Sequence, residues 1–293
     1  MEYTVQRIFQ QSNWRLILVK SMSVMSITFI ILGFFFAWEA LGDERVSPKY
    51  SVQNLAQKDF TYFGRDIFND AKHFYSKETL RYWSMALSQS LLLSYTPIDN
   101  SIGEAYQESI RGPKSDKVAK LVKPLGKWEK TWPIFFAASV FDYIPWKNQP
   151  PVLRTVGNWG SRSSRTLLLG WPSVALFQRV VGSPRPNTGI SEWQPFENAS
   201  GVSGHAFVGA VPFLAAATMA ENIWLKSMFI TASTATGISR INDNKHYTSQ
   251  VVLGWLAAWL SARAVSITEK SYARRSNISL LVYGNGIQVA GCF

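Results

Sequence analysis

Apolar segments with helical spacing, separated by short polar stretches, make up most of the chain. Leu80, Trp83 and Leu87 recur near the helical period, and they predict an amphipathic helix over residues 79–96. The same pattern predicts helices over residues 133–143, 155–181, 204–220, 224–238 and 248–265, the second of them interrupted at Gly170 to Pro172. The chain is therefore predicted to have an all-α fold, built as a helical bundle.

A lysine-rich stretch, residues 112–128, interrupts the helical pattern. It is broken by Pro113, Pro124 and Gly126, which favour turns over a continuous helix. We expect an exposed loop with one short helix here, and we expect its charges to be solvated.

The N-terminal region has the pattern of a membrane anchor. Residues 21–40 are largely apolar, and about twenty such residues match the thickness of a bilayer. Arg7, Arg15 and Lys20 precede this run and predict a cytoplasmic N-terminus, which places the rest of the chain in the periplasm or outside the cell. The small residues Ala40 and Gly42 also fit a cleavage site, so a signal peptide is the alternative to an uncleaved transmembrane anchor.

The C-terminal region alternates apolar and polar residues around Gly284-Asn285-Gly286, which predicts a short β-hairpin. The patterns together divide the chain into an anchor or signal segment (1–42), a linker with short helices (43–78), a helical domain (79–275) and a hairpin tail (276–293).

Three polar clusters carry the candidate chemistry. Arg185 and Arg240 lie in the first and third clusters, and guanidinium groups bind phosphate oxygens in pairs. Ser203 precedes an apolar helix that begins at Gly204, so the backbone N–H groups at its start would face an anion.

The clusters also contain two of the three histidines in the chain. His205 lies in the first turn of the predicted helix, where it could act as a general acid. His246 could attack phosphorus in line and form a phosphohistidine. Such a reaction depends on positioning and charge neutralisation, so it implies no metal and no other cofactor.

The order and spacing of the clusters resemble the type 2 phosphatidic acid phosphatase superfamily, which includes bacterial acid phosphatases and vanadium haloperoxidases. That family's signature is K-x6-R-P, then P-S-G-H, then S-R-x5-H-x3-D. The resemblance implies a helical bundle of that family's kind. It also implies that Arg185, Ser203, Gly204 and Arg240 bind phosphate, that His205 protonates the leaving group and that His246 is the nucleophile.

The chain departs from the signature at three positions, where Gln178, Val202 and Gln250 replace Lys, Pro and Asp. In the family the Asp orients the nucleophilic histidine. Gln250 can accept the same hydrogen bond but carries no charge, so slow turnover is expected. Arg179 is a candidate for the missing cation, and Asp243 is a candidate for the missing carboxylate.

The composition of the chain indicates which kinds of molecule it binds. The formal charge is +11, which favours anionic lipid headgroups. Nucleic acid is disfavoured because the basic residues are scattered and no binding motif occurs. The single cysteine, Cys292, excludes an intrachain disulfide.

These observations predict a metal-independent phosphatase that acts on phosphate monoesters or diphosphates, with a lipid phosphate favoured over a small soluble ester. The alternatives are a catalytically weakened protein that binds phosphate or anionic lipid, and a vanadate-dependent haloperoxidase. A purely structural membrane-associated protein would leave Arg185, His205 and Arg240 far apart. The candidate catalytic helices are shorter than a bilayer span, which favours one anchor over a six-span integral enzyme.

Overall fold

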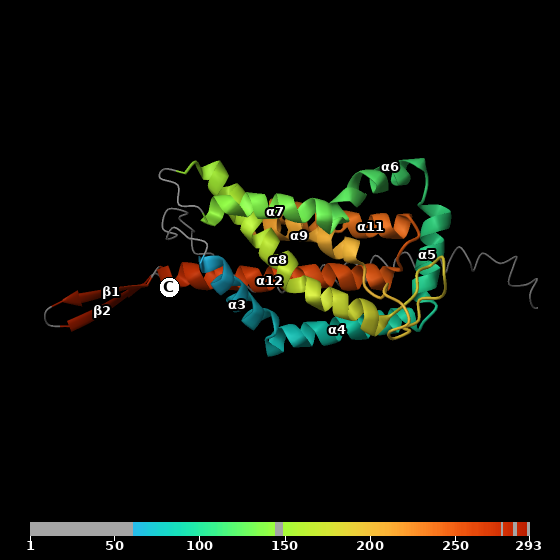
Figure 1. Ribbon diagram of the computed structural model, residues 1–293, viewed down its shortest axis with the longest axis horizontal. Helices are drawn as coiled ribbons and strands as arrows, with labels where there is room; N and C mark the ends of the chain where they lie inside the picture. Colours follow the sequence, from blue (N-terminus) through green and yellow to red (C-terminus); the bar gives the residue numbers. More distant parts are fainter. Residues whose placement is uncertain (1–60, 144–148, 277, 284–285, 292–293) are drawn as a thin grey trace, which may run out of the picture.

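The computed structural model describes residues 61–143, 149–276, 278–283 and 286–291, with side chains described up to residue 272. The predicted anchor or signal segment and Cys292 lie outside these residues. Helix and strand labels follow Figure 1. The elements are α3 (Thr61–Phe74), α4 (Lys77–Ser94), α5 (Ile98–Ser109), α6 (Pro113–Val122), the 3-10 helix η2 (Lys123–Gly126), α7 (Trp128–Tyr143), α8 (Pro151–Val181), α9 (Gly204–Met219), α10 (Ile223–Ser233), α11 (Ala235–Asn242), α12 (Thr248–Ser276), β1 (Ile278–Tyr283) and β2 (Gly286–Gly291).

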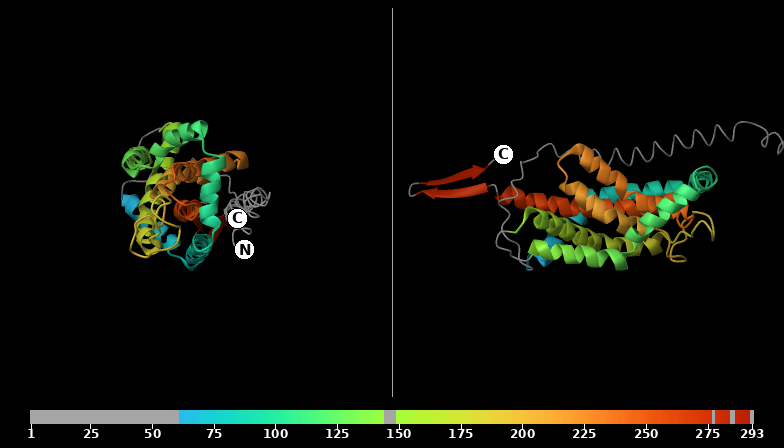
Figure 2. Two further views of the ribbon diagram at one scale, coloured as in Figure 1. Left: turned by 90° about the vertical axis from the view of Figure 1, so that its right-hand side faces the viewer. Right: turned by 90° about the horizontal axis from the view of Figure 1, so that it is seen from above.

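The described helices form an elongated bundle around α12, which runs along its long axis (Figures 1 and 2). Helices α8, α9, α3 and α4 pack against α12. The core between them is apolar, and Phe207, Leu253 and Leu260 are almost completely buried. The all-α prediction is confirmed.

Helix α12 is the one helix among the described residues that is long and apolar enough to cross a membrane, over Thr248–Tyr272. Most of that stretch is buried inside the bundle. Because the core helix of a soluble protein has the same length and composition, this is weak evidence of membrane association.

Helix α8 runs without a break, so the interruption expected at Gly170 to Pro172 is wrong. A proline inside a helix removes one backbone hydrogen bond and bends the chain. Pro172 lies on the exposed side of α8, while Val174 and Leu169 are buried. Packing on both sides of the proline keeps the helix continuous.

The end of α8 directs the following loop toward the site. Gly182 adopts the left-handed conformation with φ of 57°, and its N–H donates to the Gln178 carbonyl at 3.3 Å. A glycine at this position ends a helix without steric cost. The chain then leaves α8 as the loop of residues 183–203.

The segment predicted as one helix over 224–238 is two helices, α10 and α11, that meet at Thr234. The Ser233 and Thr234 hydroxyls donate to the carbonyls of Ile230 and Thr231, at 2.5 and 2.8 Å. Such side-chain bonds compete with the helical ladder. Trp255 also donates to the Ser233 hydroxyl, at 2.7 Å, which attaches this junction to α12.

A buried ion cluster joins α3, α8 and α12. Arg165 is fully buried, and its guanidinium donates to both oxygens of Asp70, at 2.8 and 2.7 Å. It also pairs with Glu269 on α12, and with Asp66 at 3.5 Å. Residues 61–74 are therefore packed into the helical body.

Helix α12 continues to Ser276, beyond the predicted end at residue 265, because polar residues such as Glu269 and Thr268 are buried there. Strands β1 and β2 then pair antiparallel, with Ile278 opposite Gly291 and Tyr283 opposite Gly286. This pairing confirms the predicted hairpin, which extends away from the bundle (Figure 1).

Candidate active site

The three polar clusters meet at one end of the bundle. The first follows α8, the second begins α9, and the third lies between α11 and α12. The Ser203 N–H donates to the Gln250 carbonyl at 2.9 Å, which joins the second cluster to the third. This end lies opposite the hairpin in Figure 1.

Gln250 holds the ring of His246. The distance between His246 Nδ1 and Gln250 Oε1 is 2.7 Å. The same oxygen accepts the Tyr247 backbone N–H at 3.2 Å. Gln250 is 1 % exposed, so this contact is shielded from water.

The other side of the Gln250 amide fixes which atom faces the histidine. Its Nε2 donates to the Pro184 carbonyl at 2.7 Å and to Ser183 Oγ at 3.1 Å. A carbonyl is only an acceptor, so the amide nitrogen must face Pro184 and the amide oxygen must face His246. His246 Nδ1 therefore carries the proton, and Nε2 keeps its lone pair.

Asp99 on α5 stabilises the first turn of α12, which contains Gln250. Its carboxylate accepts the Ser249 N–H at 3.1 Å and the Ser249 hydroxyl at 2.5 Å, at the start of α12. Burial raises the pKa of Asp99, while the bonds from Ser249 act in the opposite sense. This contact fixes the helical turn that presents Gln250.

Positive groups surround His246. Burial lowers its pKa to about 4; the Gln250 hydrogen bond opposes this shift, whereas the charges of Arg185, Arg240 and His205 add to it. Burial also lowers the pKa of His205, with Arg240 the next cause. Both imidazoles are therefore neutral at neutral pH in the absence of a bound anion.

Because the charges of Arg185, Arg240 and His205 all act on the pKa of His246, the four side chains lie near one another, which excludes a protein in which they are scattered. Arg185 is exposed, and its Nε donates to Ser200 Oγ at 3.2 Å. Arg240 is 5 % exposed at the end of α11.

Ser203 caps α9. Its hydroxyl accepts the Ala206 N–H at 3.3 Å, and the residue is fully buried. The first N–H groups of a helix have no intrahelical acceptor, so those of Gly204 and His205 are available to an anion.

Gln178 and Arg179, at and beside the position where the family signature has Lys, do not supply a cation to the site. Gln178 Nε2 donates to the Val202 carbonyl at 3.1 Å, so its side chain supports the loop before Ser203. Arg179 is exposed on the last turn of α8, and its side chain makes no hydrogen bond or ion pair with the described residues. The structure does not bring Arg179 into contact with the histidines.

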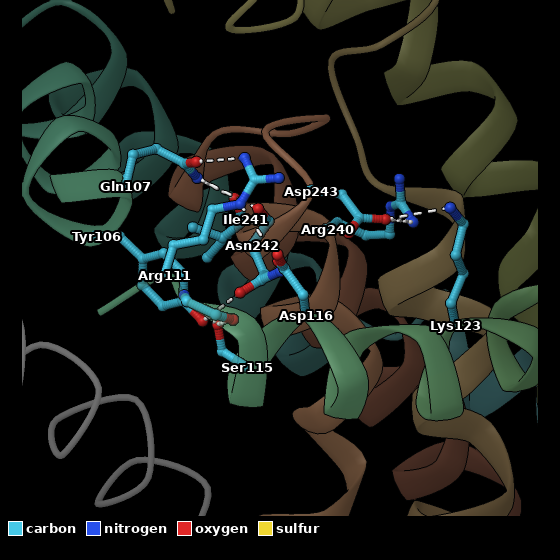
Figure 3. Close-up of polar contacts among 11 residues, drawn as sticks. Tyr106, Gln107, Arg111, Ser115, Asp116, Lys123, Arg240, Ile241, Asn242 and Asp243 are labelled. Atoms are coloured by element: carbon cyan, nitrogen blue, oxygen red, sulfur yellow. Dashed lines mark hydrogen bonds and ion pairs between the residues drawn. The ribbon is translucent and has the colours of Figure 1, made fainter. Parts of the chain in front are cut away.

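Asp243 does not replace the orienting carboxylate. Its Oδ2 accepts from Arg240 Nη1 and from Lys123 Nζ, both at 3.1 Å (Figure 3). The histidine ring is held by Gln250 instead.

Lys123 is the residue near the site that the sequence did not single out. It begins η2, within the stretch expected to be an exposed loop, and it lies more than a hundred positions from Asp243. Only the basic composition of residues 112–128 gave any signal. That segment contains the expected short helix, α6, but it continues as η2 instead of a loop, and η2 packs against α9 and α11.

No group of three or more His, Cys, Asp or Glu residues in the described part of the chain is placed to hold a metal ion. Besides the Asp243 carboxylate, the polar groups around the histidines are donors and cations, which are suited to an anion.

Comparison with known families supports the same class of site. Residues 166–272 match the family model described as the PAP2 superfamily. This segment contains all three polar clusters, and it is consistent with a member of the type 2 phosphatidic acid phosphatase superfamily. The resemblance seen in the motifs is confirmed at this level, and it supports a phosphatase-type or haloperoxidase-related function in general. No significant match to the chain was found among curated proteins or among solved structures.

Proposed function

We propose that the protein is a metal-independent phosphatase that forms a phosphohistidine at His246. The observation that carries the proposal is the orientation of the His246 ring. Gln250 accepts a hydrogen bond from the Nδ1–H of His246, so the lone pair of Nε2 remains for attack on phosphorus.

The surrounding groups supply the rest of the reaction. Arg185 and Arg240 would neutralise the phosphate oxygens, together with the N–H groups at the start of α9. As the bond from His246 Nε2 to phosphorus forms, the bond to the leaving oxygen breaks, and His205 would give that oxygen a proton. Water would then hydrolyse the phosphohistidine and release inorganic phosphate.

Neutrality of His246 favours the first step. A protonated imidazole has no lone pair to donate, and the pKa of His246, lowered by burial, keeps the ring neutral over most of the acid range. A bound phosphate dianion would stabilise the protonated form of His205 and prepare it as the acid. The two histidines can therefore take different roles in one site.

We propose a lipid phosphate as the substrate because apolar side chains are exposed near the site. Exposed apolar residues occur over much of the described surface, and five of them lie near the site, at the end of α4 and in the loop before α9. They are Leu91, Leu92, Tyr95, Ile190 and Phe196. The Tyr95 hydroxyl donates to the Trp193 carbonyl at 3.3 Å, which connects the two segments.

An open, mainly apolar groove of about 570 Å³ runs along the same helix. Its lining includes Met85, Leu92 and Ile98, and Ile98 is adjacent to Asp99, which supports the start of α12. A hydrocarbon chain could lie in this groove while its phosphate occupies the site. Membrane location and an extracytoplasmic face are part of the proposal, and they rest on the apolar N-terminal run and the net charge of +11.

The proposal is tested by phosphate release from lipid phosphates, lipid diphosphates and p-nitrophenyl phosphate without added metal. His246→Ala should abolish turnover while the protein remains folded. His73→Ala, which changes the histidine outside the site, should leave it unchanged. Activity that survives in His246→Ala would reject the proposed nucleophile.

A phosphate-binding protein with little turnover is the second candidate, and Gln250 favours it. A neutral amide holds the ring in the same tautomer but stabilises the imidazolium less than a carboxylate does, which slows formation of the phosphohistidine. Binding of vanadate or phosphate without release from any ester would support this candidate. Bromide oxidation by the vanadate-loaded protein would identify a haloperoxidase.

A further inference from the structure

The 3-10 helix η2 forms a wall of the candidate site. A Cβ at Gly126 would lie 2.9 Å from both the Cβ and the carbonyl oxygen of His205, and 2.7 Å from the Thr236 methyl. Only a residue without a side chain allows this approach. The backbone of η2 therefore lies directly against the proposed general acid.

The helix before η2 is fixed by a polar network at the end of α11 (Figure 3). Asn242 Nδ2 donates to Asp116 Oδ1 at 2.7 Å, and Asn242 is 1 % exposed. Gln107 on α5 donates to the Ile241 carbonyl at 2.7 Å. The first contact fixes α6 relative to α11, and the second fixes α5 relative to α11. The position of α6 in turn sets the point from which Lys123 reaches the site.

One carboxylate oxygen holds two cations beside the site. Lys123 Nζ and Arg240 Nη1 both bond to Asp243 Oδ2 at 3.1 Å, and Figure 3 shows the two contacts converging on this carboxylate. The Lys123 side chain is 42 % exposed, so the ammonium can exchange Asp243 for an incoming anion. Lys123, Arg240 and Asp243 together carry a net positive charge, which favours that exchange.

We propose that Lys123 is a specificity-determining residue that binds the leaving group and favours substrates in which that group is itself a phosphate. The inference rests on the proposed function. Because η2 touches His205, Lys123 lies on the side of the site where the leaving oxygen receives its proton. The pKa of His205 is also lowered by Lys123, after burial and Arg240.

The charge balance of the reaction explains the preference. With a diphosphate, His246 Nε2 bonds to the terminal phosphorus, and the bridging oxygen leaves with the electron pair of the bond that breaks and takes no proton from His205. The departing phosphate then gains negative charge, which an ammonium group within reach stabilises. An alcohol leaving group gains a proton from His205 and ends neutral, so it benefits little from Lys123.

The test compares geranyl diphosphate with geranyl monophosphate, which share one alcohol. Lys123→Met retains the apolar stem and removes the charge, and Lys120→Met makes the same change at an exposed position of α6. Lys123→Met should lower kcat/KM for the diphosphate about tenfold or more and for the monophosphate less than about threefold, since a charge-assisted hydrogen bond to substrate is lost in only one case. Lys120→Met should change neither, and Lys123→Arg should retain most of the preference.

Equal losses on both substrates, or no loss, would overturn the proposal. If the wild type hydrolyses neither compound, the proposed phosphatase function fails. The role of Lys123 is then tested separately, by the dissociation constants of inorganic pyrophosphate and phosphate for the wild type and Lys123→Met. Lys123→Met should then weaken pyrophosphate binding more than phosphate binding. A parallel change in the two dissociation constants would reject Lys123 as a selective ligand.

Discussion

The amide of Gln250 shows how a single residue can orient a catalytic ring without charge. Its oxygen accepts from His246 while its nitrogen donates to Pro184 and Ser183. The Ser183 hydroxyl donates onward to the Ser191 carbonyl at 2.8 Å, so its oxygen is left to accept from Gln250. The loop after α8 therefore requires a donor at position 250, which an aspartate or glutamate could not supply.

We predict that Gln250→Glu destabilises the protein. The carboxylate would face the Pro184 carbonyl and would lose two donated bonds, so the free energy of unfolding should fall by about 1–3 kcal/mol. Chemical denaturation measures this change. Gln194→Glu is the control, because Gln194 accepts from Asn198 through its oxygen and a carboxylate keeps that bond. A Gln250→Glu protein as stable as the wild type would show that the hydrogen-bond assignment is wrong.

The two histidines predict an acidic pH optimum. His246 must be neutral to attack, and its pKa is lowered to about 4, so kcat/KM should fall only below that pH. His205 must be protonated, and its pKa is lowered from 6.5, so kcat/KM should already decline as pH rises toward neutrality. A pH profile of kcat/KM, corrected for ionisation of the substrate, tests both limbs. An optimum above neutral pH would contradict the assigned roles.

At the scale of elements, Arg165 holds three helices together through charge. It pairs with carboxylates on α3 and α12 in a site closed to water. Removal of one partner from a buried ion network leaves uncompensated charge, which is the most costly kind of polar substitution.

We therefore predict that Arg165→Met lowers the free energy of unfolding by about 3–5 kcal/mol. Arg111→Met is the matched control, since Arg111 and Asp116 form a pair exposed on both sides and such surface pairs contribute about 0–1 kcal/mol. Urea denaturation of both variants measures the difference. Similar losses in the two proteins would show that the cluster does not stabilise the bundle.

The sequence predicted most helices because their apolar spacing is local information. It identified α4, α9 and the hairpin within a few residues. The predictions were wrong where contacts between distant residues determine the helix boundaries. Pro172 stays helical because both of its flanks are packed, and α12 continues past residue 265 because Glu269 pairs with Arg165. The junction at Thr234 depends on hydroxyl bonds that apolar spacing does not reveal.

The candidate site shows the same division. The motif positions His205, His246 and Arg240 could be identified from order and spacing, and the fold brings them together. Lys123 could not, because its place beside Arg240 depends on the packing of η2 against the start of α9. The role of Gln250 as a two-sided amide also depends on a loop that only the folded chain brings near it.

On the scale of the whole molecule, the site and the end of α4, with the exposed Leu91 and Leu92, lie at one end of the bundle, and the hairpin lies at the other (Figure 1). This arrangement would let the phosphate of a membrane lipid enter the site while its chain stays in apolar surroundings. The net charge of +11 adds attraction to an anionic surface.

We predict that Leu92→Glu lowers turnover of a lipid phosphate in vesicles about tenfold or more, because it places a charge where an apolar chain would lie. Turnover of soluble p-nitrophenyl phosphate should be unchanged. Val152→Glu, at an equally exposed position on the first turn of α8, should affect neither substrate. Lower turnover of both substrates would show that the substitution damages the fold. Unchanged turnover of the lipid phosphate in vesicles would show that this face of α4 does not bind lipid.

The phosphohistidine itself gives the most direct test of the account. The protein should be mixed with p-nitrophenyl phosphate, quenched in alkali, which preserves phosphohistidine, and digested for mass spectrometry. We predict a phosphate on His246 in the wild type and none on the protein in His246→Ala. Turnover of the ester without phosphate on His246, or with phosphate on another residue, would contradict the central claim.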